Sequence, residues 1–194
     1  MRNDTQVDFL FHDVCFNSSL KSYELLYELL CSRLIHFSAG IVGSFHVAEE
    51  IVSDVFIVIW QKKHQLISVK QPLIYLYTCT RNLSINKLPQ RKGGNIPFDS
   101  LDKDALCVMP DVEQKLLSEE VSRIVEQAIR ELPGKCQLIF RLIKIDGLSY
   151  KETAALLDIS PKTVDAQLAI AIKKLSTTIR LHMPADLITS YFRH

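Results

Sequence analysis

The stretch Leu148-Ser-Tyr-Lys-Glu-Thr-Ala-Ala-Leu-Leu-Asp-Ile-Ser-Pro-Lys-Thr-Val-Asp-Ala-Gln-Leu168 contains the start signals of two helices in close succession. Ser149 and Glu152 have the spacing of a capping box, in which each side chain accepts a hydrogen bond from the other residue's backbone N–H. Ser160 followed by Pro161 is a second start signal, because serine caps a helix and proline loses no hydrogen bond at the first helical position. The pattern predicts a helix-turn-helix.

The second of these helices has one apolar face and one polar face. Its apolar residues recur at helical spacing and predict a buried face: Val164, Leu168, Ala171, Ile172, Leu175 and Ile179. In DNA-binding helix-turn-helix proteins, the start of the second helix contacts phosphates and base edges in the major groove. Two capped helices around a short turn also occur in helical bundles that bind no DNA, so the rest of the chain has to decide between these alternatives.

Composition and charge exclude several other functions. The chain has 194 residues, which suits one or two small domains, and its six glycines form neither a dinucleotide-binding nor a phosphate-loop motif. The formal net charge is only +1, so DNA contact would have to come from local patches and would be weak for the chain alone. No catalytic motif is evident, and we expect the protein not to be an enzyme.

The cysteines and the apolar runs indicate in which cellular compartment the protein is expected to act. The five cysteines are scattered and include no C-x-x-C pair, which favours reduced thiols in a cytoplasmic protein over a zinc site or a disulfide framework. We expect no signal peptide, no apolar run long enough to span a membrane, and no bound cofactor or metal, because the sequence shows none of the corresponding motifs.

Helical periodicity divides the chain into two blocks. We expect a loose start or one short helix over residues 1–18, and further helices over residues 20–37, 47–63, 72–88, 113–130 and 133–147. The segment 47–63 is ambiguous, since its β-branched and aromatic residues also suit a strand, but apolar pairs every four positions favour a helix. Prolines and glycines punctuate residues 89–112, which we interpret as a linker.

Segments in both blocks resemble one known family. In the first block these are Ala48-Glu-Glu-Ile-Val-Ser-Asp-Val-Phe-Ile-Val-Ile-Trp60 and Pro72-Leu-Ile-Tyr-Leu-Tyr-Thr-Cys-Thr-Arg-Asn-Leu-Ser-Ile-Asn-Lys87. In the second they are Leu132-Pro-Gly-Lys-Cys-Gln-Leu-Ile-Phe-Arg141 and the helix-turn-helix over residues 149–168. In this order they resemble regions 2 and 4 of an extracytoplasmic-function (ECF) sigma factor, a small member of the sigma-70 family.

The resemblance implies an all-α fold of two small helical domains joined by a flexible linker. The region 2 domain would span residues 1–88, the linker 89–112, the region 4 domain 113–180, and a tail 181–194. It further implies a cytoplasmic, non-catalytic, DNA-binding sigma factor that binds core RNA polymerase and promoter DNA and initiates transcription. An anti-sigma factor would be a further partner, and no membrane insertion is expected. The alternative is an autonomous helix-turn-helix regulator, which would bind duplex DNA tightly without polymerase.

The resemblance also assigns candidate site residues. Core polymerase would contact Glu49, Glu50, Ser53 and Asp54, which would otherwise be a solvated helix face. The minus-10 element would contact His64, Lys70, Tyr75, Arg81, Asn82, Lys87 and Arg91. The minus-35 element would contact Ser160, Lys162, Thr163, Asp165, Ala166, Gln167 and Lys173.

The aromatic residues of the first block leave a choice between two roles. Unstacked bases need aromatic platforms, and Tyr75 and Tyr77 are candidates, although aromatic residues at this spacing are more often core. We expect Trp60 to belong to the core.

Overall fold

The computed structural model describes residues 2–88 and 119–182, and these form helices and no strand, as the sequence predicts. The linker 89–112 with Arg91, the residues 113–118 that would begin the second domain, and the tail from 183 onward lie outside the described residues. The elements are α1 (Arg2–Asn17), α2 (Leu20–Val42), α3 (Phe45–Lys62), η1 (Lys63–Gln65), α4 (Pro72–Lys87), α5 (Glu119–Arg130), α6 (Gly134–Phe140), η4 (Arg141–Ile145), α7 (Tyr150–Leu157) and α8 (Pro161–His182).

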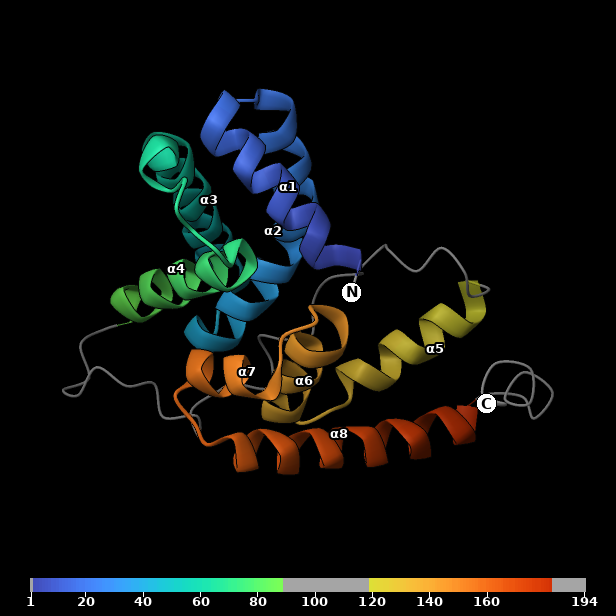
Figure 1. The fold of residues 1–194 in the computed structure, drawn as a ribbon. Coiled ribbons are helices and arrows are strands. Elements are labelled where there is room, and N and C mark those ends of the chain that lie inside the picture. Colours follow the sequence, from blue (N-terminus) through green and yellow to red (C-terminus); the bar gives the residue numbers. More distant parts are fainter. Residues whose placement is uncertain (1, 89–118, 183–194) are drawn as a thin grey trace.

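Helix α2 is the centre of the first helical group and packs against α1, α3 and α4 (Figure 1). Its residues Leu26, Leu30 and Leu34 are fully buried, at the spacing of one helical face. The helix continues past the predicted end at residue 37 and stops at Gly43, which adopts a left-handed φ of 73°.

Helix α2 also corrects one expectation from the sequence. It is long and apolar enough to cross a membrane by length and composition alone, although we expected no run of that kind. More than half of its most apolar window is buried inside the protein, as in the core helix of a soluble protein, so the feature is weak evidence for a membrane span.

The ambiguous segment 47–63 is the helix α3, as predicted. Ser44 caps it by accepting a hydrogen bond from the backbone N–H of Val47 at 3.4 Å. The adjacent residues Val55 and Phe56 are both buried, while Ile57 is 51% exposed. A strand would place Val55 and Phe56 on opposite faces, whereas a helix can bury both.

The start of the chain is more ordered than the sequence suggested. Residues 2–17 form the helix α1, which is longer than the short helix considered as one alternative. Its buried residues Val7, Leu10, Phe11 and Val14 recur at intervals of three and four and pack into the core.

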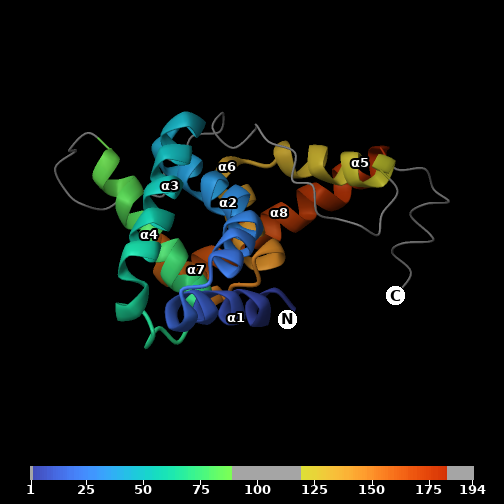
Figure 2. The same cartoon turned by 90° about the horizontal axis from the view of Figure 1, so that it is seen from above.

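The second helical group is built on α8. Helices α5, α6 and α7 pack along α8, and α7 also contacts α4 of the first group (Figure 2). Most of the predicted apolar face of α8 is buried, but Ile172 is 44% exposed, so its assignment to that face was wrong.

Gly147 forms the sharp connection between η4 and α7 with a φ of +79°. A Cβ atom at this position would meet nothing within 4 Å, so the backbone conformation alone sets the cost of a side chain. We expect Gly147→Ala to lower the free energy of unfolding by about 1–2 kcal/mol. Gly147→Asn should cost less, because asparagine tolerates the left-handed region. Urea unfolding curves measure both losses, and an alanine variant as stable as the parent would contradict this explanation.

Candidate nucleic-acid and polymerase interfaces

The helix-turn-helix forms from the local signals that the sequence contains. The capping box is complete, because the Glu152 N–H donates to Ser149 Oγ at 3.3 Å and the Ser149 N–H donates to Glu152 Oε2 at 2.7 Å. Helix α7 ends at Asp158, which takes a left-handed φ of 55° where glycine is more usual. The chain then turns into α8, whose cap is Ser160.

The first turn of α8 faces solvent. Ser160, Lys162, Asp165 and Ala166 are exposed, as is Lys173 farther along the helix, while Thr163 is half-buried. Ser160 Oγ accepts from the Thr163 N–H at 3.0 Å and lies 2.8 Å from Thr163 Oγ1, so both hydroxyls are engaged in the cap. Lys162 and the N-terminal turn remain open to an anion, because helix N-termini attract negative charge.

Gln167 is not presented with these residues. Its side chain is half-buried, and Oε1 accepts a hydrogen bond from the Cys136 thiol on α6 at 3.1 Å. The structure therefore brings Lys162, Asp165 and Ala166 together on one surface but turns Gln167 back toward the protein. Because its Oε1 is already hydrogen-bonded within the protein, this arrangement weighs against its predicted role in reading a base.

A second candidate surface lies on α3. Glu49, Glu50, Ser53 and Asp54 are all exposed on the side opposite the buried stripe of this helix. Glu50 pairs with Lys87 of α4 at 3.5 Å and with His46 at 3.6 Å. The predicted polymerase-binding face is therefore in contact with a residue predicted to bind DNA.

The predicted minus-10 residues spread over η1, the following loop and α4. His64, Lys70, Asn82 and Lys87 are exposed, and Arg81 is half-buried. Tyr75 is also half-buried, with its ring packed edge-on against Phe11 at 6.2 Å between centroids. Burial and a hydrogen bond with Cys79 raise the pKa of Tyr75 to about 12.

Tyr77 is not accessible as a platform for a base in this structure. Its side chain is completely buried, and its hydroxyl donates to Asp146 Oδ2 at 2.6 Å. Burial, with Asp146 beside it, raises the pKa of the Tyr77 hydroxyl well above its usual value. The sequence could not indicate this contact, because Asp146 lies in the other helical group.

Comparisons with known proteins place this chain among sigma factors. The family described as "Sigma-70, region 4" matches residues 122–175, which include the whole helix-turn-helix. The ECF RNA polymerase sigma-E factor of Escherichia coli strain K12 is 25% identical over 171 residues, covering 82% of this chain and 90% of the relative. The ECF RNA polymerase sigma factor SigW of Bacillus subtilis strain 168 is 26% identical over 160 residues, covering 76% of this chain and 77% of the relative. These similarities support an ECF sigma factor of the sigma-70 family.

A solved structure is also similar to this sigma factor. It is CnrH in complex with the cytosolic domain of CnrY, with a TM-score of 0.49, 15% sequence identity, and coverage of 90% of this chain and 98% of the other. From its family and its relatives, the protein is a sigma factor that acts in transcription initiation.

One exposed residue of this sigma factor escaped the sequence analysis. Ile57 lies on α3 within a turn of Ser53 and Asp54 and adds apolar surface to the acidic face. The sequence signal that could have identified Ile57 is that it is an apolar residue outside the apolar stripe of α3. Trp60, which we expected to belong to the core, is only half-buried: its ring packs against Tyr23, and Lys63 Nζ lies 4.2 Å from its ring centroid.

Proposed function

We propose that this sigma factor binds the minus-35 promoter element through α8 and the minus-10 element through residues 64–71 and α4. The exposed face of α3 would bind core RNA polymerase. The observation that carries the proposal is the solvent-facing first turn of α8, presented by a completely capped helix-turn-helix.

The arrangement of α8 supports contact with a DNA groove. Leu168 and Val164 anchor the helix against α6 and α7, while Lys162 and Asp165 face outward. An anchored helix with an exposed polar start can enter the major groove without rearranging its own core. Lys162 would contact phosphate, and Asp165 and Ala166 would lie closest to base edges.

The surface of the first helical group supports the proposed contacts with the minus-10 element and with core polymerase. Exposed cationic and amide side chains on and near α4 can follow the backbone of a single strand. The acidic side chains of α3, with Ile57 among them, offer a partner both charge and apolar area.

We further propose that the protein has no catalytic activity of its own and acts in the cytoplasm, where it would meet core polymerase and promoter DNA. Its small net charge agrees with weak DNA binding by the chain alone. Affinity would come from linkage of two weak DNA contacts through polymerase. Similarity to ECF sigma factors also suggests an anti-sigma factor as a regulatory partner.

Run-off transcription tests the proposed function directly. Core RNA polymerase and a pool of genomic promoter fragments from the source organism are mixed with and without the chain. New transcripts that depend on the chain would support the proposal and reveal the promoter motif. Absence of transcripts, with tight duplex binding by the chain alone, would instead identify an autonomous regulator.

The predicted phosphate contact of Lys162 has a measurable signature. We expect Lys162→Ala to weaken promoter binding by the chain–polymerase complex about equally for all minus-35 variants, and to reduce the slope of log affinity against log salt by about 1. Fluorescence polarisation at several salt concentrations measures both quantities. Lys21→Ala, at an exposed lysine on α2, is the matched control. A loss confined to one promoter variant would show that Lys162 reads a base instead.

A further inference from the structure

Gln167 lies at the boundary between the buried and the exposed faces of α8. It follows Val164 by three residues and precedes Ala171 by four, and both of these residues are fully buried in the second helical group. It also follows the half-buried Thr163 of the first turn by four residues, so these two side chains are neighbours on the helix surface. From this position the flexible side chain of Gln167 can point inward to α6 or outward along the surface of the first turn.

A hydrogen bond selects the inward direction. Cys136 Sγ donates to Gln167 Oε1 at 3.1 Å across the contact between α6 and α8. Cys136 is only 2% exposed, and burial raises the pKa of its thiol, which favours the protonated form that can donate. Buried polar groups in proteins are normally hydrogen-bonded, and Gln167 supplies an acceptor to this thiol.

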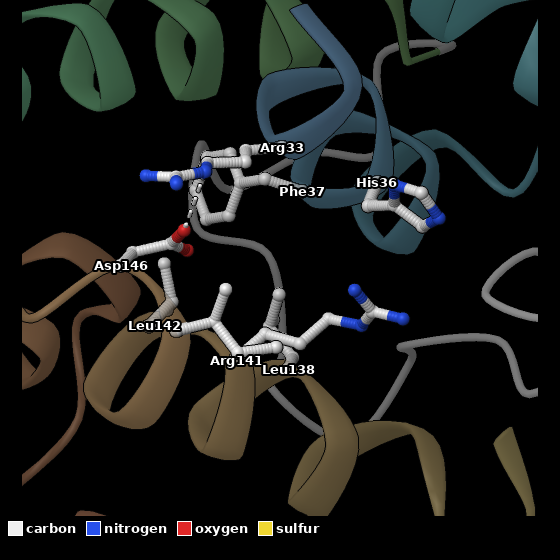
Figure 3. Close-up of a pocket in the computed structure, with 8 residues that line it drawn as sticks. Arg33, His36, Phe37, Leu138, Arg141, Leu142 and Asp146 are labelled. Atoms are coloured by element: carbon white, nitrogen blue, oxygen red, sulfur yellow. Dashed lines mark ion pairs between the residues drawn. The ribbon is translucent and has the colours of Figure 1, made fainter. Parts of the chain in front are cut away.

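Cys136 is held in place within the second helical group. It is buried in one cluster with Ala171 and Leu175 of α8. Two residues farther along α6, on the opposite side of the helix, Leu138 lines a small pocket together with Phe37 of α2 (Figure 3). The thiol therefore faces α8, and its hydrogen bond to Gln167 does not depend on contact between the two helical groups.

The inward orientation engages the group that would recognise a base. Glutamine recognises adenine through two hydrogen bonds, in which its amide nitrogen donates to N7 and its amide oxygen accepts from the N6 amino group. In the structure the Gln167 amide oxygen is bonded to the Cys136 thiol, and the side chain is turned away from the exposed Asp165 and Ala166. Reading adenine would therefore require Gln167 to exchange the thiol for the base.

We propose that Cys136 is a positioning residue that holds Gln167 away from the DNA and so sets the base selectivity of α8. Cys136 touches no DNA in this arrangement and acts through Gln167 alone. The preference for adenine at the base pair nearest Gln167 is then lowered by the free energy of one hydrogen bond. The effect on selectivity rests on the proposed function of α8, whereas the orientation of Gln167 in the free chain does not.

The promoter selectivity of the complex between the full chain and core polymerase tests this role. The complex binds a library of promoter fragments randomised in the minus-35 element, and the bound fragments are sequenced. We expect Cys136→Ala to raise the preference for adenine at one position by about fivefold over the parent, because no hydrogen bond to the thiol has to be broken. Cys136→Ser, which keeps a donor, should retain the parent's selectivity. Cys136→Ala combined with Gln167→Ala should lose the new preference.

A matched control separates positioning from general damage to the fold. Cys15→Ala also removes a buried thiol, but on α1, and it should leave the selectivity at the minus-35 element unchanged. All variants should keep the far-UV circular dichroism of the parent. A folded Cys136→Ala variant with the parent's selectivity would overturn the proposal, as would the same new preference in the variant that also lacks the Gln167 amide.

Nuclear magnetic resonance of the free, full-length chain tests the orientation of Gln167 without DNA or polymerase. We expect nuclear Overhauser contacts between the Gln167 side-chain amide protons and the β protons of Cys136 in the parent and in Cys136→Ser. In Cys136→Ala the corresponding contacts to the alanine methyl group should be lost, and persistence of the inward orientation there would overturn the proposal. If the complex selects no promoter fragment although the contacts change as expected, the proposed function of α8 fails while the positioning role of Cys136 is supported.

Discussion

Charge reversal of Asp54 to lysine should weaken association of this sigma factor with core RNA polymerase by about thirtyfold, or about 2 kcal/mol. Asp54 is exposed on α3 beside Ser53 and Ile57, at the middle of the proposed contact face. A lysine there would replace attraction to a basic partner with repulsion, which slows encounter and destabilises the complex. Fluorescence anisotropy of the labelled chain, titrated with core polymerase, measures the change.

A second carboxylate provides the control for this experiment. Glu24 is exposed on α2, outside the α3 face, and Glu24→Lys changes the net charge of the chain by the same amount. It should leave the affinity for polymerase within about twofold of the parent. Helicity measured by circular dichroism should be the same in both variants. Equal affinities for the two variants would remove Asp54 from the interface.

The sequence predicted the helix-turn-helix well because its signals are local. The capping box of Ser149 and Glu152 and the cap at Ser160 depend only on residues within one helical turn, and the structure contains both. The helical assignment of α3 depended on the spacing of its apolar residues and on the helix-forming residues at its start, and it was also confirmed. Local propensity and periodicity agree with the global fold in these segments, so little else was needed to predict them.

Contacts between distant residues could not be predicted in this way. The hydrogen bond from Cys136 to Gln167 turns a side chain that the sequence placed among the DNA contacts toward the protein. The contact between Tyr77 and Asp146 buries a tyrosine considered as a base platform. Both contacts join residues on different helices, and no pattern within a single helix encodes its partner. Whether the exposed candidates contact polymerase or DNA therefore stays a prediction.

Truncation of Phe56 should have the largest effect on stability. Its ring is 1% exposed on α3 and packs edge-on against Tyr27 and Tyr23 of α2, with centroid distances of 4.9 and 5.9 Å. Phe56→Ala removes this buried ring and leaves a cavity between the two helices. We expect the free energy of unfolding to fall by about 3–5 kcal/mol, a large part of the total for a domain of this size. Urea unfolding followed by circular dichroism measures the loss.

The neighbouring residue makes this test specific to the helical register of α3. Ile57 is 51% exposed, so Ile57→Ala should change the free energy of unfolding by no more than about 0.5 kcal/mol. The two substitutions remove apolar side chains at adjacent positions of one helix, and only their orientation distinguishes them. If Ile57→Ala proved as costly as Phe56→Ala, α3 would have to be rotated about its axis. The acidic face proposed for polymerase would then no longer point to solvent.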